Sequence, residues 1–115
     1  MIKLGTLALA MAVIGTASAF AGEPIEGTWL RDNGTLVKYA SAGGDKYCGT
    51  VMNNKYAGQS IGCMSGKGGK YKGQVIVLDE GKTYSGKASV KGNVMSLAGC
   101  VLGGLICKSA DLKRQ

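Results

Sequence analysis

The stretch that decides the fold is Lys82-Thr83-Tyr84-Ser85-Gly86-Lys87-Ala88-Ser89-Val90. Tyr84, Gly86, Ala88 and Val90 alternate with Thr83, Ser85, Lys87 and Ser89 over the whole segment. A strict period of two places one set on a buried face and the other in solvent, which is typical of an antiparallel strand. This segment therefore predicts a β-sheet with one covered face.

Segments of similar length and composition repeat on both sides of it. Turn signals such as Asp32-Asn33-Gly34, Asp79-Glu80-Gly81 and Lys91-Gly92-Asn93 separate short runs rich in Val, Ile, Tyr, Thr and Leu. No run shows a sustained helical period with caps. The pattern predicts eight strands at approximately 26–31, 34–41, 46–52, 57–63, 70–78, 82–90, 93–99 and 104–110.

Each connection is short enough for a hairpin, so the chain is expected to form an all-β, antiparallel up-and-down barrel. Closing such a meander removes exposed strand edges. Eight strands enclose a space that side chains fill or that holds one small ligand. Glycine is abundant, with 20 residues, and small inward residues such as Gly86 and Ala88 favour a tight barrel.

Residues 1–21 have the features of a cleaved secretory signal. Lys3 precedes an uncharged apolar run from Leu4 to Ile14, and small residues follow. The apolar run is shorter than the roughly 20 residues that span a bilayer. Cleavage is expected after Ala21, with Ala19 as the alternative. The mature domain would then be residues 22–115, a periplasmic or secreted protein without a transmembrane segment.

The charge of the chain restricts its partners. The whole chain carries a net charge of +7, and losing Lys3 with the signal leaves +6. A basic face is predicted from lysines that include Lys70, Lys72, Lys82 and Lys87. Such a face would suit an anionic partner, such as a membrane surface or an acidic small molecule, although lysines also protect sheet edges. Nucleic acid is not expected as a partner of an exported protein.

Four cysteines lie in the mature region, at positions 48, 63, 100 and 107. An even number in a small exported domain predicts disulfides. A two-residue hairpin at Gly103-Gly104 would place Cys100 opposite Cys107, and the favoured second bond is Cys48–Cys63. The alternative is a long-range bond from Cys48 to one of the last two. A zinc site is not expected, because the chain has no histidine and no C-x-x-C pair.

No catalytic constellation is apparent, so an enzyme is not expected. Without histidine, the commonest general base and the usual triads are absent. Asp79-Glu80 before Gly81 is interpreted as a solvated turn. No bound cofactor is predicted.

Two sets of residues carry resemblances to known families. Gly27-Thr28-Trp29 on the first strand, with Arg114 after the last, resembles the closure motif of lipocalins and related calycin barrels, in which a cation stacks on an indole. Four further blocks resemble DUF2147, a domain-of-unknown-function family of small exported bacterial proteins; they are Tyr47-Cys48-Gly49-Thr50-Val51, Gly81-Lys82-Thr83-Tyr84-Ser85-Gly86, Gly99-Cys100-Val101 and Ile106-Cys107-Lys108-Ser109.

The DUF2147 resemblance extends from Gly27 to Arg114 and implies a lipocalin-like barrel of unassigned biochemistry. The family's usual second tryptophan before the arginine is replaced by Leu112, and Cys63 is additional to the common pattern. The expected function is binding of a small apolar or anionic ligand in the cell envelope. The alternative is contact with an envelope protein or a membrane surface through the basic face.

Overall fold

The computed structural model describes residues 22–115, and the predicted signal peptide lies outside this range. No α-helix occurs in these residues, which form eight strands and one short 3-10 turn, η2. The strands are β1 (Gly27–Leu30), β2 (Leu36–Ser41), β3 (Lys46–Val51), β4 (Ser60–Lys67), β5 (Lys70–Val77), β6 (Lys82–Lys91), β7 (Val94–Val101) and β8 (Ile106–Arg114), with η2 at Leu102–Gly104.

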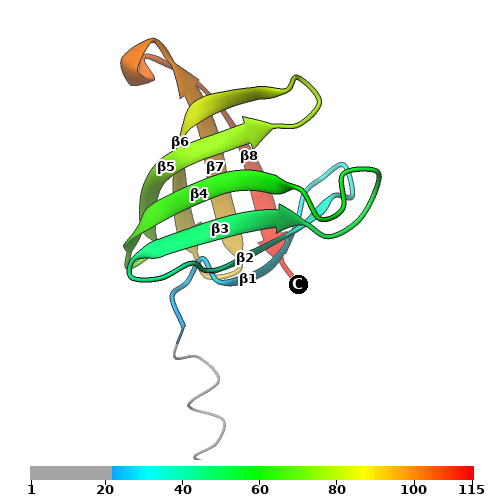
Figure 1. Cartoon of the computed structure of the whole chain (residues 1–115). Helices are drawn as coiled ribbons and strands as arrows, with labels where there is room; N and C mark the ends of the chain where they lie inside the picture. Colours follow the sequence, from blue (N-terminus) through cyan, green and yellow to red (C-terminus); the bar gives the residue numbers. More distant parts are fainter. Residues whose placement is uncertain (1–21) are drawn as a thin grey trace, which may run out of the picture.

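The strands close into an antiparallel up-and-down barrel in sequence order (Figure 1). Each strand pairs with its neighbours in the chain, and β1 pairs with β8 through Trp29 opposite Arg114. The predicted fold class is thus confirmed. Closure occurs because β8 continues to Arg114, beyond the expected end at residue 110.

The alternation predicted for residues 82–90 is present in β6. Ala88 is buried and Tyr84, Gly86 and Val90 are half-buried, whereas Thr83, Ser85 and Lys87 are exposed. Ser89 departs from the predicted pattern, because it is half-buried. Directly paired residues of antiparallel strands lie on the same face of the sheet. The register therefore carries this inward face across to Leu97 and Gly99 on β7, and on to Lys108 and Ala110 on β8.

Predicted boundaries were wrong at β4 and at the β7–β8 hairpin, as well as at the end of β8. β4 was expected at 57–63 but spans Ser60–Lys67, and the turn before β5 contains only Gly68 and Gly69. Gly66 stays in the strand because it pairs with Tyr71. The β7–β8 hairpin has a four-residue loop, Leu102–Leu105, since the last pair is Val101 with Ile106.

Glycines on the inward face let neighbouring strands curve closely around the barrel. Gly49 pairs with Gly62, Gly73 with Gly86, and Gly86 with Gly99. The close approach is clearest at Gly73, where a Cβ atom would lie 2.1 Å from the carbonyl oxygen of Cys63. Only glycine fits there without moving the β4 backbone.

Candidate functional site: a cavity open at one end of the barrel

The topology gives the barrel two different ends. The connections β1–β2, β3–β4, β5–β6 and β7–β8 meet at one end, which we call the open end. The N-terminal segment 22–26 and the three remaining connections meet at the other, the closed end. The two ends differ in packing.

Large side chains fill the closed end. The largest fully buried side chains of residues 22–115 gather mainly there; they are Trp29, Tyr39, Ile25, Met64, Met95, Leu112 and Val37. Tyr47 and Tyr71 pack edge to face in the same cluster, with ring centroids 5.9 Å apart. Leu112, which stands where a second tryptophan was expected from the family resemblance, is fully buried and packs in this core.

Arg114 closes this end over Trp29. Its Cζ lies 4.3 Å from the centroid of the indole ring, and the indole Nε1 donates a hydrogen bond to the carbonyl oxygen of Ile25 at 2.9 Å. The guanidinium also donates to three carbonyl oxygens, those of Pro24 at 2.8 Å, Glu26 at 3.1 Å and Gly92 at 3.3 Å. Gly27 lies beside this group, where an added Cβ would be 3.3 Å from Arg114 Nη1.

The N-terminal segment is held at the closed end by a second polar group. The hydroxyl of Tyr71 donates to Glu23 Oε1 at 2.8 Å, and the Gly68 N–H donates to the same oxygen. Burial and then the hydrogen bond to Glu23 raise the pKa of Tyr71 to about 12. Sequence reasoning missed Glu23 because its partners are 45 and 48 residues away in the chain.

The half of the barrel next to the open end is hollow. A cavity of about 890 Å³ extends from the open end down to the packed residues of the closed end. Its walls include six aliphatic side chains, Val37, Val51, Ile61, Val75, Leu97 and Leu112. Typical small-molecule sites have volumes of about 300–1,000 Å³ and mainly apolar walls. The cavity therefore has the size and lining of a ligand site.

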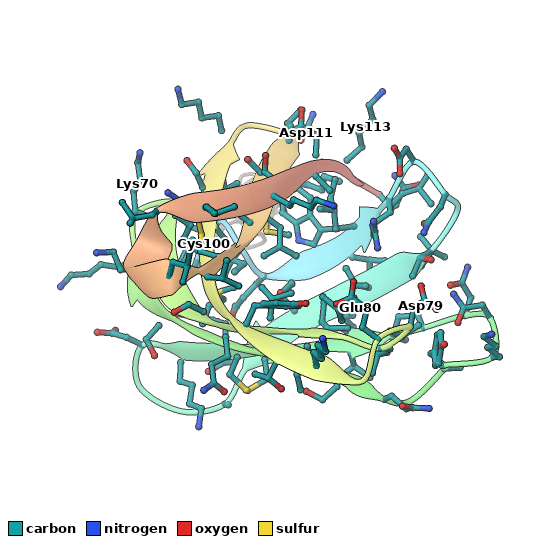
Figure 2. The ribbon with its side chains drawn as sticks, turned by 90° about the horizontal axis from the view of Figure 1, so that it is seen from above. Lys70, Asp79, Glu80, Cys100, Asp111 and Lys113 are labelled. Carbon is teal, nitrogen blue, oxygen red and sulfur yellow. A yellow bond between two sulfur atoms is a disulfide. The ribbon has the colours of Figure 1, made fainter. Side chains whose placement is uncertain are left out.

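Acidic side chains on the β5–β6 turn form one part of the rim. Asp79 accepts a hydrogen bond from the Tyr56 hydroxyl at 2.8 Å, and Glu80 accepts one from Tyr84. The bond to Glu80 is the main cause that raises the pKa of Tyr84. Figure 2 shows Asp79 and Glu80 together, on the opposite side of the view from Lys70. This turn is exposed, as predicted, and it also anchors two rim tyrosines.

Basic side chains line other parts of the rim. Arg31 follows β1, Lys55 belongs to the β3–β4 connection, and Lys108 lies on β8 next to β1 in the barrel. Lys108 shares the inward face because it pairs with Gly99. The period of two that links it to Ala110 and Leu112 was a signal that could have identified it.

Tyr39 has the only buried side-chain polar atom without a hydrogen-bond partner in residues 22–115. Its ring lies against Gly49, beside Ile61 of the cavity wall. Burial raises the pKa of this hydroxyl well above its ordinary value. The tyrosine is thus held neutral at the boundary between the cavity and the packed end.

The structure brings together three of the four lysines predicted as a basic face. Lys72 and Lys87 are direct cross-strand partners, and Lys70 lies two residues before Lys72. Lys82 is separate from them, because it pairs with Val77 at the far end of the same two strands. The three grouped lysines border a shallow hollow on the outer face, which also has four serines, Ser65, Ser89, Ser96 and Ser109.

The cysteines form two bonds, Cys48–Cys63 and Cys100–Cys107, and no described cysteine is free. This is the pairing favoured from the sequence. Both bonds join directly paired residues of adjacent strands. The expected two-residue loop was wrong, but Cys100 and Cys107 still face each other.

Within residues 22–115, no group of three or more His, Cys, Asp or Glu side chains is arranged to hold a metal ion. Among the same residues, no helix has the length and apolar character needed to cross a membrane.

Comparison with known proteins identifies one family. Residues 27–114 match the family model described as "Uncharacterized protein conserved in bacteria (DUF2147)". No curated protein and no solved structure matches the chain.

Proposed function

Since the chain belongs to the DUF2147 family, we propose that it is a lipocalin-like binding protein that holds a small apolar or amphiphilic ligand in its barrel. The observation that carries this proposal is the cavity of about 890 Å³, open at one end and closed by Trp29 and Arg114 at the other. A wholly packed interior would have argued against a ligand.

The rim supports a ligand with a polar or anionic end. Lys108 lies on the inward face at the rim, and no hydrogen bond or ion pair links its ammonium group to another described residue. Asp79 and Glu80, in contrast, already accept hydrogen bonds from tyrosines. An apolar body would occupy the aliphatic walls, and an anionic group would lie near Lys108.

The proposed location is the periplasm or the exterior of the cell. Two disulfides support an oxidising compartment, and the sequence of residues 1–21 supports export. We propose a binding role rather than catalysis because the rim carboxylates engage tyrosines and the chain has no histidine.

A cavity-filling substitution tests the proposal. Ala110 lies on the inward face opposite Leu97, so Ala110→Phe adds a ring to the cavity. Thr83→Phe adds the same ring to the exposed outer face of β6 and is the matched control. The probe is anilinonaphthalene sulfonate, an anionic apolar dye followed by its fluorescence.

Ala110→Phe is expected to weaken dye binding at least about tenfold, because the ring occupies the same space. Thr83→Phe should bind like the parent protein. Native mass spectrometry of the protein isolated from its own host would also reveal a retained ligand. Equal dye binding by both variants, or none by the parent protein, would contradict a site inside the barrel.

A further inference from the structure

The tip of the β7–β8 hairpin carries four exposed aliphatic side chains within six consecutive residues. Val101 is 40%, Leu102 68%, Leu105 85% and Ile106 56% exposed, and only two glycines separate them. We call these four residues the apolar tip. Figure 1 shows this hairpin projecting beyond the rest of the barrel. Leu102 and Leu105 are more exposed than any other large apolar residue described.

Folding does not explain the leucine at position 102. Its φ is +53°, and Gly103 and Gly104 beside it also have positive φ. A residue with a Cβ atom is strained in this region, which glycine and asparagine tolerate better. Leu102 is therefore both strained and exposed, so its side chain has no stabilising role within the described barrel.

The base of the hairpin is fixed. Cys100 and Cys107 are bonded directly below the tip, and Val101 pairs with Ile106 above them. The disulfide holds the two strands together, while Leu102 and Leu105 stay 68% and 85% exposed. Such a hairpin can present its apolar side chains to a partner without first becoming ordered, which reduces the entropic cost of binding.

A basic surface adjoins this hairpin on the outer face. Its lysines are Lys70, Lys72 and Lys87, and Cys107 contributes to the same hollow. None of the residues that line this hollow is acidic. Lys72 and Lys87 are directly opposite each other, an arrangement that destabilises a sheet unless a counter-charge is supplied. We call this surface the basic hollow.

We propose that the apolar tip and the basic hollow together dock the protein onto an anionic phospholipid bilayer. The tip would enter the boundary between headgroups and acyl chains, and the lysines would face lipid phosphates. A second protein is a poorer fit, because four aliphatic residues on a narrow projection provide little of the roughly 800 Å² that each partner commonly buries. Charge complementarity favours the bilayer.

This inference goes beyond ligand binding and does not depend on it. Val101 and Ile106 belong to the apolar tip and also line the cavity. Docking would therefore bring the rim of the cavity next to the bilayer. An amphiphile could then pass between the two without crossing open water.

The test measures sedimentation with vesicles, using disulfide-bonded protein whose N-terminus is established by intact mass. One set of vesicles is phosphatidylcholine, and the other contains about a third phosphatidylglycerol, enough to give a negative surface potential. The double variant Leu102→Asn with Leu105→Asn, which we call the tip variant, replaces the two most exposed apolar side chains of the tip by polar ones. Asparagine tolerates the positive φ of position 102, so loss of binding cannot be attributed to strain at that position.

The parent protein is expected to bind the anionic vesicles, and the tip variant to bind them at least about tenfold more weakly. Lys72→Gln and Lys87→Gln should each weaken binding by about fivefold, and added salt should do the same. Val94→Ser is the matched control, because Val94 is an exposed aliphatic residue at the closed end, 41% exposed.

Several results would overturn the proposal. They are equal binding by the parent protein and the tip variant, equal loss in Val94→Ser, and equal binding to both kinds of vesicle. Absence of vesicle binding, with tip-dependent crosslinking to an envelope protein, would assign the tip to a protein partner instead. A Leu105→Trp variant adds a second readout, since its emission should shift to the blue only when vesicles bind. Dye binding in the cavity is measured separately. It distinguishes a failure of membrane docking from a failure of the proposed ligand site.

Discussion

The guanidinium of Arg114 lies over the indole of Trp29, although the two residues belong to opposite ends of the described chain. They are direct partners on β8 and β1, the pair of strands that closes the barrel. Arg114 also donates to carbonyl oxygens from the N-terminal segment and from the β6–β7 turn. One side chain thus joins three segments at the closed end.

Replacing Arg114 by leucine is expected to lower the free energy of unfolding by about 2–4 kcal/mol. The variant loses the cation–π contact and leaves carbonyl oxygens of Pro24 and Glu26 without their donors. Arg114→Lys retains the charge but cannot reach all the same acceptors, so about half of the loss should remain. Urea unfolding measures the free energy of unfolding of both variants. A change below about 0.5 kcal/mol for Arg114→Leu would contradict a stabilising role of Arg114 at the closed end.

Tyr39→Phe is expected to leave stability unchanged or to raise it by up to about 1 kcal/mol. Its hydroxyl is buried without a partner, so removing it also removes a desolvation penalty. Tyr71→Phe is the matched control, since that hydroxyl donates to Glu23 and accepts from Ile25 N–H. The control should lose about 1–3 kcal/mol in the same urea experiment. A large loss in Tyr39→Phe would indicate that its hydroxyl does have a partner.

Stability is expected to fall at alkaline pH because of the raised tyrosine pKa values. Tyr71 ionises near 10.0 in the unfolded chain and at about 12 in the folded protein. Its contribution is therefore complete below pH 10 and is lost as the pH rises towards 12. Tyr39 acts in the same direction. Denaturant unfolding across this interval should show the fall, and Tyr71→Phe should make it shallower; an equal slope in the variant would exclude Tyr71 as a cause.

Alanine is expected to destabilise the barrel strongly at one inward glycine and hardly at all at another. Gly73→Ala places a Cβ atom 2.1 Å from a β4 carbonyl oxygen and 2.8 Å from the Met64 Cα, so backbone must move. We expect a loss of about 3 kcal/mol or more. Gly99→Ala meets only the Tyr84 side chain, at 3.5 Å, and should change stability by less than about 1 kcal/mol. Thermal unfolding of both variants gives the comparison, and similar midpoints would contradict it.

Much of the fold was predictable from local pattern. The alternation in residues 82–90 is present in β6, and glycine-containing turns separate most strands where expected. The boundaries of β4 and β8 were not predictable from local pattern. Gly66 stays extended because β5 pairs with it, and β8 continues to Arg114 because β1 pairs with it.

The site was less predictable than the fold. Trp29 and Arg114 were identified as a pair because Gly27-Thr28-Trp29 and Arg114 resemble a known closure motif, and the structure brings the two side chains together. Lys82 was grouped with Lys70, Lys72 and Lys87 because they are close together in the sequence. The hairpin register places Lys82 opposite Val77, at the other end of β5 from Lys70. Lys108 was not identified as a cavity residue from the sequence, and only its pairing with Gly99 shows that it lies on the inward face.

The sequence by itself determined that this protein is an antiparallel meander of short strands, because alternation and hairpin spacing act between near neighbours. The β1–β8 pairing that closes the barrel and the choice between the two disulfide pairings were decided by the tertiary structure. Only the tertiary structure decided that one half of the barrel is packed and the other hollow. A cavity is the difference between the space that eight strands enclose and the volume of the side chains that point into it, and no local stretch contains that difference. The exposure of Leu102 and Leu105 is likewise a property of the folded barrel, which leaves the hairpin tip uncovered.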